Sequence, residues 1–248
     1  MIKVSIITAC YNRVSTIREA IESVLLQDYP NIEYIIVDGA STDGSLLVID
    51  EYKDRIDRII SESDNGMYEA INKGIRLATG DIIGLVHSDD TLWDNHVVRD
   101  IAGQFEQSAV DAIYGDGAFV DPKETNKIKR NWKGGKFSRL KVKLGWLPLH
   151  PTCYMRREVM MQNGLYDESY KIAADTELLI RYFLNERIKV SYYPRRIIRM
   201  RLGGLSTDRD TRKQMWKEDV RLYREHGFWG IPTKLMKMMW KIPQFFCK

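Results

Sequence analysis

The stretch that decides the fold is Val4-Ser5-Ile6-Ile7-Thr8-Ala9-Cys10-Tyr11-Asn12, an apolar, β-branched run that ends in polar residues. Such a run is typical of a buried strand. Ser15 is expected to cap a helix over residues 17–25, whose apolar side chains recur at helical spacing. Residues 34–37 form the next β-rich run, which ends at Asp38. A strand, a helix and a second strand in this order predict a βαβ unit and therefore a parallel sheet.

The same alternation continues along the chain. Residues 39–45 are dense in Gly, Ser, Thr and Asp, which predicts a tight loop. Further strands are expected at 56–60, 81–86, 112–114, 152–155, 190–193 and 197–200. Further helices are expected at 46–52, 67–78, 97–107, 158–163 and 175–185, with an irregular region after Asp121. The pattern predicts an α/β fold with a mainly parallel central sheet and flanking helices.

Length and composition favour one large domain, or a domain with a short appendage, in a chain of 248 residues. Cys10, Cys153 and Cys247 are widely spaced, so neither a disulfide framework nor a cysteine zinc site is expected. We find neither the roughly 18 consecutive apolar residues of a spanning helix nor a signal-peptide layout. We therefore expect a cytoplasmic protein.

Four acids, Asp38, Asp64, Asp89 and Asp90, lie at or just past the ends of predicted strands. In a doubly wound sheet these strand ends share one edge, where ligands bind. A single strand-end aspartate is as readily a helix cap or an Asx turn, but four on one edge favour a ligand site.

Adjacent carboxylates such as Asp89-Asp90 suit Mg²⁺ or Mn²⁺, which in turn can bridge a diphosphate. Asp175, at the start of a predicted helix, is a candidate general base that takes a proton from a hydroxyl. It is equally suited to stabilise the helix N-terminus, and both interpretations stay open on the residues alone.

A longer set of motifs resembles family 2 glycosyltransferases with the GT-A fold. It includes the opening stretch, Ile36-Val37-Asp38-Gly39-Ala40-Ser41-Thr42-Asp43-Gly44-Ser45, Ser88-Asp89-Asp90, His150-Pro151-Thr152 and Ala174-Asp175-Thr176-Glu177. Further matching segments are 23–27, 64–74, 79–81, 164–168 and 203–206, and all of these motifs follow the family's order. The resemblance covers residues 3 to 207. It implies a Rossmann-like GT-A domain over 1–210, with a nucleotide-binding half (1–116) and an acceptor half (117–210).

The resemblance also implies an activity, the transfer of one sugar from a nucleotide-diphosphate sugar, with UDP expected first, to an acceptor hydroxyl with inversion. It implies nucleotide contacts from Ala9, Tyr11, Asp38, Asp64 and Asp89; metal contacts from Asp90 and Asp89; Asp175 as the base; and acceptor or diphosphate contacts from His150, Trp146 and Arg181. Two departures stand out: Ala174 replaces a glutamate that is common in the family, and the QxxRW signature of processive members is absent. Single-sugar transfer is therefore favoured.

Two segments are basic. Residues 123–143 hold nine Lys or Arg against the single acid Glu124. In the C-terminal segment, 211–248, apolar residues recur at helical spacing beside a narrow face formed by Lys234, Lys237 and Lys241. This basic amphipathic helix either lies on an anionic membrane, with its lysines toward the lipid, or packs back on the domain. The first option suits cell-surface polysaccharide or glycolipid assembly on the inner face of the cell membrane, with a glycan or lipid-linked acceptor.

Two other classes of function fit the sequence less well. A sugar-phosphate nucleotidyltransferase needs a glycine-rich loop after the first strand, and Ala9-Cys10-Tyr11-Asn12-Arg13 has no glycine. A non-catalytic nucleotide-sugar-binding module would not need Asp38, Asp90 and Asp175 together. The chain also lacks an aromatic-studded nucleic-acid motif, so no nucleic-acid partner is expected.

Overall fold

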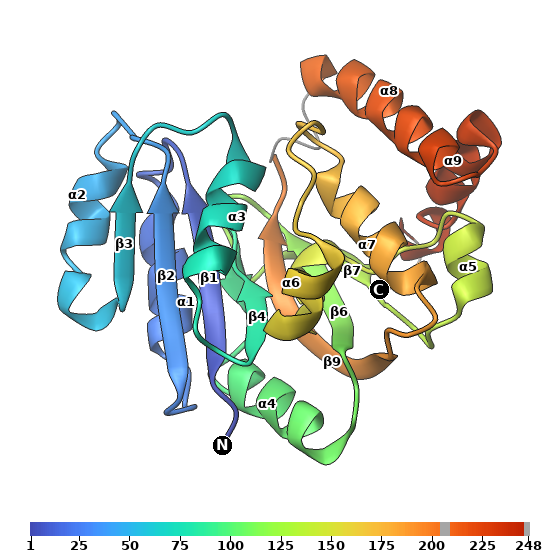
Figure 1. Ribbon diagram of the computed structural model, residues 1–248. Coiled ribbons are helices and arrows are strands. Elements are labelled where there is room, and N and C mark those ends of the chain that lie inside the picture. The colour runs from blue at the N-terminus through green and yellow to red at the C-terminus, as the bar shows by residue number, and fades with distance from the viewer. Residues whose placement is uncertain (204–208, 246–248) are drawn as a thin grey trace.

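The computed structural model describes residues 1–203 and 209–245, and these residues form a nine-stranded sheet with helices around it (Figure 1). The strands are β1 (Val4–Cys10), β2 (Ile32–Asp38), β3 (Arg58–Ser61), β4 (Ile82–Leu85), β5 (Thr91–Leu92), β6 (Ala112–Val120), β7 (Ile128–Trp132), β8 (Tyr154–Arg156) and β9 (Val190–Arg201). The α-helices are α1 (Ile17–Leu25), α2 (Ser45–Asp50), α3 (Met67–Leu77), α4 (Val97–Gln107), α5 (Arg139–Lys143), α6 (Arg157–Asn163), α7 (Ala174–Leu184), α8 (Arg209–Glu225) and α9 (Gly230–Met239). Three 3₁₀ helices are η1 (Lys53–Arg55), η2 (His150–Thr152) and η4 (Ile242–Phe245).

The strand order is β3-β2-β1-β4-β8-β6-β9-β5, with β7 paired to β6 beside this path. Strands β1 to β4 are parallel, and so are β6 and β9, whereas β8 runs antiparallel to both β4 and β6. The prediction of a mainly parallel α/β sheet is therefore confirmed. The antiparallel strands β5, β7 and β8 all lie in the half of the sheet beyond β4.

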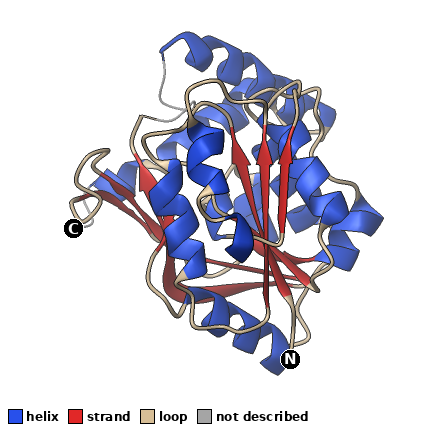
Figure 2. Ribbon diagram, turned by 90° about the vertical axis from the view of Figure 1, so that its left-hand side faces the viewer, coloured by secondary structure: helices blue, strands red, loops and turns tan. Residues whose placement is uncertain are grey.

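Helices cover both faces of the sheet (Figure 2). They can do so because successive side chains of a strand point to opposite faces. Ile7 and Ile35 point into a core formed with α3, α6 and α7. Their neighbours Ile6 and Ile36 point the other way, into a core formed with α1 and α4. The parallel strands are thus buried on both sides, as their continuous apolar sequences require.

The carboxyl ends of the parallel strands lie at one edge of the sheet, because Cys10 pairs with Asp38 and Asp38 with Ser61. Helix α7 begins near this edge: the Tyr68 hydroxyl, at the start of α3, donates to the Ile172 carbonyl, 2.7 Å away. The loops after the strands and the start of α7 therefore lie close together.

The structure departs from the predicted elements mainly after residue 116. The runs 190–193 and 197–200 form a single strand, β9, which pairs with the whole of β6 across two register shifts. The region predicted to be irregular contains β7 and α5. Strand β7 forms an antiparallel hairpin with β6, and its first residues, Ile128 and Lys129, are exposed, so it lacked the apolar signal of a buried strand.

The C-terminal helices pack against the rest of the chain. Leu222 and Tyr223 of α8 are fully buried in the core that also contains α7. In the part of the chain that the structure describes, no helix has both the length and the apolar character needed to cross a bilayer.

We predict opposite effects on stability for two glycine-to-alanine changes. A Cβ atom at Gly84 of β4 would overlap the fully buried ring of Tyr154, so Gly84→Ala should lower the unfolding free energy by about 1–3 kcal/mol. The helical Gly103 has open space around its missing Cβ, so Gly103→Ala should raise it by about 0.5–1 kcal/mol. Urea unfolding of both variants measures the difference, and a Gly84→Ala protein as stable as the parent would contradict the packing described here.

Candidate functional site

The carboxyl edge of the sheet opens into a cavity of about 400 Å³. Its lining comes from segments that are far apart in the chain: the end of β1, the loop after β4, the segment around η2, the start of α7, and the C-terminal helices. Of the residues selected from the sequence, the cavity is lined by Ala9, Asp89, Asp90, Trp146, His150 and Asp175.

The two adjacent acids lie in the loop that follows β4. Asp90 is 2% exposed, and its Oδ1 accepts a hydrogen bond of 3.2 Å from the Arg201 backbone amide. Its Oδ2 is buried without a hydrogen-bond partner among the described residues. Burial raises the pKa of Asp90 well above its usual value, the negative charge of Asp89 adds to this rise, and the Arg201 amide opposes it.

This buried oxygen fits a divalent cation, which would supply the missing positive charge. Within residues 1–203 and 209–245, no three His, Cys, Asp or Glu side chains form a group that could hold a metal alone. The protein would therefore offer Asp90 and Asp89, while water and the phosphate oxygens of a ligand complete the coordination, as Mg²⁺ commonly requires.

Arg201 is a site residue that the sequence analysis missed. It lines the cavity, its guanidinium donates to the Asp89 carbonyl at 2.6 Å, and it forms an ion pair with Glu19 of α1. Arg201 is only 8% exposed, and through its contacts with the Asp89 carbonyl and with Glu19 it connects the acid loop to α1. Arg201 ends a strand that was predicted to stop at residue 200, and no local motif marks it.

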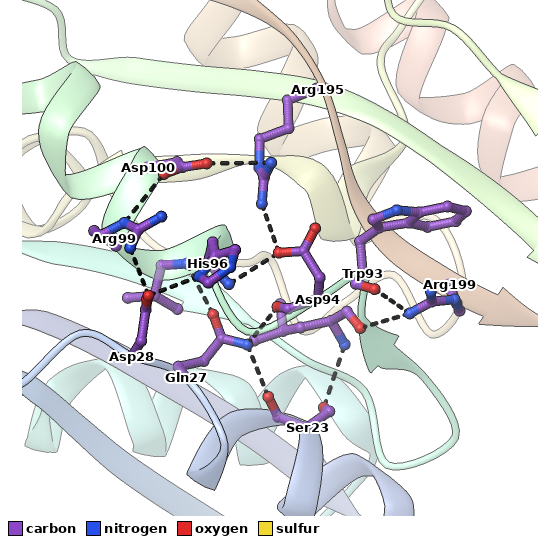
Figure 3. Close-up of polar contacts among 12 residues, drawn as sticks. Ser23, Gln27, Asp28, Trp93, Asp94, His96, Arg99, Asp100, Arg195 and Arg199 are labelled. Atoms are coloured by element: carbon purple, nitrogen blue, oxygen red, sulfur yellow. Dashed lines mark hydrogen bonds and ion pairs between the residues drawn. The ribbon is translucent and has the colours of Figure 1, made fainter.

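A polar network holds the segment that follows the acid pair (Figure 3). The Gln27 amide donates to the Ser23 and Asp94 carbonyls, at 3.0 and 2.7 Å. Arg199 of β9 donates to the Leu92 carbonyl at 3.1 Å, and Arg195 pairs with Asp94 at 2.6 Å. The turn after Asp90 is thus tied to α1 and β9, so side chains remote from the cavity position the acids.

The expected nucleotide residues Asp38, Tyr11 and Asp64 gather at the ends of β1, β2 and β3. Asp38 is fully buried and accepts hydrogen bonds from the Ser41 amide and the Ser61 hydroxyl, at 3.0 and 2.7 Å. Tyr11 is exposed. A Cβ atom at Gly39 would lie 2.7 Å from Asp64 Oδ2 and 3.3 Å from the Tyr11 ring, so these two side chains flank the bare glycine backbone.

The two loops at this position adopt strained backbone conformations. Asn12 and Ala40 both have a positive φ, 52° and 59° respectively, which is uncommon for residues other than glycine. The loops are joined by the Asn12 amide, which donates to the Ser41 hydroxyl at 2.8 Å. Backbone strain that the surroundings maintain in this way is a common property of ligand sites.

Asp175 lines the same cavity as Asp89 and Asp90, at the start of α7. The Thr176 amide donates to its Oδ1 at 2.6 Å. The turn before it is held by Glu218 of α8, whose carboxylate accepts from the backbone amides of residues 171, 172 and 173 at 2.9–3.1 Å. Glu218 is thus a positioning residue for Asp175, and the sequence analysis missed it because it lies in the segment treated as a tail.

Two histidines line the cavity beside Asp175. The rings of His87 and His150 are stacked with their centroids 6.2 Å apart, and His150 Nε2 lies 2.7 Å from the Tyr166 hydroxyl. Burial lowers the pKa of His150 to about 4 and also lowers the pKa of His87. Both rings are therefore neutral at physiological pH and can donate or accept hydrogen bonds without adding charge.

Arg181 has a different place from the one expected. Its guanidinium donates to the carbonyls of Gly164 and Leu165, at 2.8 and 2.7 Å, and pairs with Glu177 at 2.8 Å. It is not part of the cavity lining. Six residues along a helix correspond to more than one and a half turns, so Arg181 points to a different side of α7 from Asp175. Arg181 thus holds the loop after α6, away from the cavity.

The lysines of α9 face the domain, which corresponds to the second of the two alternatives left open by the sequence. Lys234 and Lys237 both form ion pairs with Asp219 of α8, which is fully buried, and Lys237 also donates to the Thr176 hydroxyl at 3.0 Å. A buried carboxylate requires such cations, and this requirement outweighs the exposure that lysine usually prefers. The apolar side chains of α9 consequently point outward, and Leu235 and Met239 are 49% and 65% exposed.

Comparison with known proteins places this geometry in a family. A model described as Glycosyl transferase family 2 matches residues 5–163. A PGL/p-HBAD biosynthesis glycosyltransferase from Mycobacterium bovis is 29% identical over 194 residues, covering 76% of this chain and 72% of that protein. An uncharacterized glycosyltransferase from Rickettsia prowazekii is 27% identical over 219 residues, covering 86% of this chain and 68% of that protein.

Solved structures share the fold. TarS from S. aureus in complex with UDP-GlcNAc matches with a TM-score of 0.71 and 20% identity, over 90% of this chain and 66% of that one. The mannosyltransferase PcManGT from Pyrobaculum calidifontis, in complex with GDP-Man and Mn²⁺, matches with a TM-score of 0.66 and 16% identity, over 91% of this chain and 64% of that one. This chain thus spans just under two thirds of each solved chain. With the GT-A fold and more than half of its length matched by the family model, the chain belongs to glycosyltransferase family 2.

Proposed function

We propose that the protein transfers a single sugar from a nucleotide-diphosphate sugar to an acceptor hydroxyl, with inversion at the anomeric carbon. The observation that supports this most directly is that Asp175 lines the same cavity as the acid pair Asp89-Asp90. An inverting transfer needs one carboxylate near the acceptor and an electrophilic centre near the leaving diphosphate, and the cavity offers groups for both.

The donor's nucleoside would be held by Ala9, Tyr11, Asp38 and Asp64 at the ends of the first three strands. Asp90, with Asp89, would hold Mg²⁺ or Mn²⁺, and the bound ion supplies neutralisation of the charge that develops on the leaving nucleoside diphosphate. We propose UDP as the nucleotide, because TarS has been solved with UDP-GlcNAc.

Asp175 would remove the proton of the acceptor hydroxyl as that oxygen attacks the anomeric carbon from the side opposite the diphosphate. The bond to the diphosphate breaks as the new glycosidic bond forms, which inverts the configuration. Glu218 keeps the start of α7, and with it the Asp175 carboxylate, in place for this step. His150 and Trp146 would contact the acceptor from the cavity wall.

The setting that we propose is cell-surface glycan or glycolipid assembly at the inner face of the cell membrane. Trp229, Ile231, Leu235, Met238 and Met239 form an apolar outer face on and just before α9, and Trp229 is 82% exposed. Apolar and tryptophan side chains at the surface of a helix suit the interface of a bilayer. Because the lysines of α9 face inward, attachment would depend mainly on this apolar face, and charge would contribute less than the sequence suggested.

Asp175→Asn should lower the transfer rate by about two to four orders of magnitude, because the amide cannot take a proton, while donor affinity stays within about twofold. UDP released from UDP-sugars in the presence of a membrane lipid extract measures transfer, and calorimetry with UDP and Mn²⁺ measures donor binding. The exposed Asp54→Asn variant serves as the control. Loss of UDP binding in Asp175→Asn would show that the base assignment is wrong.

Asp90→Asn should stabilise the metal-free protein and remove its response to metal. The folded pKa of Asp90 is raised, so this carboxyl destabilises the folded state as pH rises through that pKa, and the penalty is present near pH 8. At that pH we expect the variant to unfold at a higher temperature than the parent. In the parent protein, Mn²⁺ with UDP should raise the unfolding temperature further, and the variant should lose this increase. Thermal unfolding between about pH 5 and 8.5 tests both effects, and an unchanged Mn²⁺ response would exclude Asp90 as a ligand.

The double variant Leu235→Ser with Met239→Ser should bind vesicles less tightly than the parent, because it removes two exposed apolar side chains from the outer face of α9. Leu47→Ser on α2, where Leu47 is 76% exposed, is the matched control. Co-sedimentation with phosphatidylglycerol-containing vesicles measures binding. Equal sedimentation of the double variant and the control would rule out this membrane face.

A further inference from the structure

His87 is a cavity residue that the transfer reaction described above does not use. It lies just after β4, where the Val86 amide still donates to the Ile7 carbonyl of β1 at 3.1 Å. The His87 carbonyl in turn accepts a hydrogen bond of 2.9 Å from the Asp90 amide, so His87 begins the turn that carries the acid pair. A rigid strand end therefore fixes His87 beside the carboxylates that are proposed to hold the metal.

The imidazole of His87 is partly buried and forms no hydrogen bond with any residue that the structure describes. Its ring stacks on that of His150, with the centroids 6.2 Å apart. His150 differs, because its Nε2 has the Tyr166 hydroxyl 2.7 Å away. A neutral imidazole carries one N–H donor and one acceptor nitrogen, and leaving such groups unpaired away from water is unfavourable. His87 thus offers both kinds of hydrogen-bonding group to a ligand in the cavity.

The chemistry of His87 suits a sugar better than a metal or a phosphate. Over residues 1–203 and 209–245, no three His, Cys, Asp or Glu side chains are grouped to hold a metal, so His87, Asp89 and Asp90 are not a three-ligand set. A phosphate is bound more strongly by charged partners than by a neutral ring. Neighbouring sugar hydroxyls each donate and accept, so they match both ring nitrogens.

His87 also lies within electrostatic reach of both ends of the proposed reaction. Burial lowers the pKa of His87, and the negative charges of Asp89 and Asp175 oppose this shift. The ring is therefore close to the acid pair and to the proposed base. In the proposed transfer, the diphosphate is bound at the acid pair and the attacking oxygen at Asp175, so the anomeric carbon lies between them. The part of the donor that comes nearest to His87 is consequently its sugar.

We infer that His87 binds the sugar of the nucleotide-sugar donor through hydrogen bonds to its hydroxyls, and thereby selects among donor sugars. This inference deepens the proposed function and rests on it, since it names the class of sugar that is transferred. A site whose polar group pairs with a substrate hydroxyl rejects analogues that lack it, because the polar group is then left unpaired. His87 therefore favours sugars that present a free hydroxyl to its ring over sugars that are deoxygenated at that position.

His87→Phe keeps an aromatic ring against His150 and removes both hydrogen-bonding nitrogens. Calorimetry with Mn²⁺ measures the affinity for UDP, UDP-glucose, UDP-galactose and UDP-N-acetylglucosamine. For the UDP-sugar that the parent binds most tightly, affinity should fall about three- to tenfold, the effect of losing one hydrogen bond, while UDP affinity stays within about twofold. His87→Gln, which keeps a donor and an acceptor, should recover most of the loss. His87→Ala should show the same difference between UDP and the UDP-sugar as His87→Phe.

Tyr52→Phe is the matched control, because it also replaces a hydrogen-bonding ring by phenyl, and Tyr52 lies outside the cavity lining, where it donates to Glu22 at 2.6 Å. It should bind all four ligands like the parent. Equal UDP-sugar affinity of His87→Phe and the parent would overturn the inference. Equal losses for UDP and the UDP-sugar would also overturn it, by assigning the ring to the nucleotide or the diphosphate. Failure of the parent to bind UDP is a separate outcome, which would overturn the proposed UDP donor and the inference together.

Discussion

A carboxylate that leaves water must be compensated by cations or by hydrogen-bond donors, and this constraint organises the molecule from the sheet to the C-terminal helices. Asp219 is compensated twice, by Lys234 and Lys237, and this cluster fixes α9 to α8. Glu218 is compensated by three backbone amides, which fixes α8 to the start of α7. Asp90 is the exception, since one of its oxygens has no partner among the described residues. The carboxylate left partly uncompensated lies where the proposed reaction would place a metal ion.

The first half of the chain could be predicted well because its signals are local. Strands β1 and β2 are apolar runs that end in polar residues, and parallel pairing brings their carboxyl ends together whatever the rest of the chain does. The placement of Asp89, Asp90 and Asp175 around one cavity agrees with the expected geometry, although their chemical roles remain proposals. The family assignment and the GT-A fold followed from the same motifs and are confirmed.

The part of the chain after residue 116 was harder to predict because its elements depend on contacts between distant residues. Strand β7 carries exposed charges, and only its pairing with β6 makes it a strand. Arg181 and Arg201 are both arginines near the motifs, yet one supports a loop and the other contacts the acid pair, and only tertiary structure distinguishes them. The lysine face of the C-terminal segment was compatible with either a membrane contact or packing on the domain, because Asp219, the partner that holds Lys234 and Lys237, lies on another helix.

The attachment of α7 to α8 also shows where this enzyme can be divided. The family model ends at residue 163, and the predicted domain ended at residue 210, yet the amides before Asp175 are held by a side chain at position 218. A fragment cut at either boundary would retain β1 to β4. A cut at residue 163 would remove Asp175 itself, and a cut at residue 210 would remove the Glu218 carboxylate that holds the turn before it. The smallest unit that keeps the start of α7 in place therefore extends at least to the end of α8, well beyond the segment by which the family is recognised.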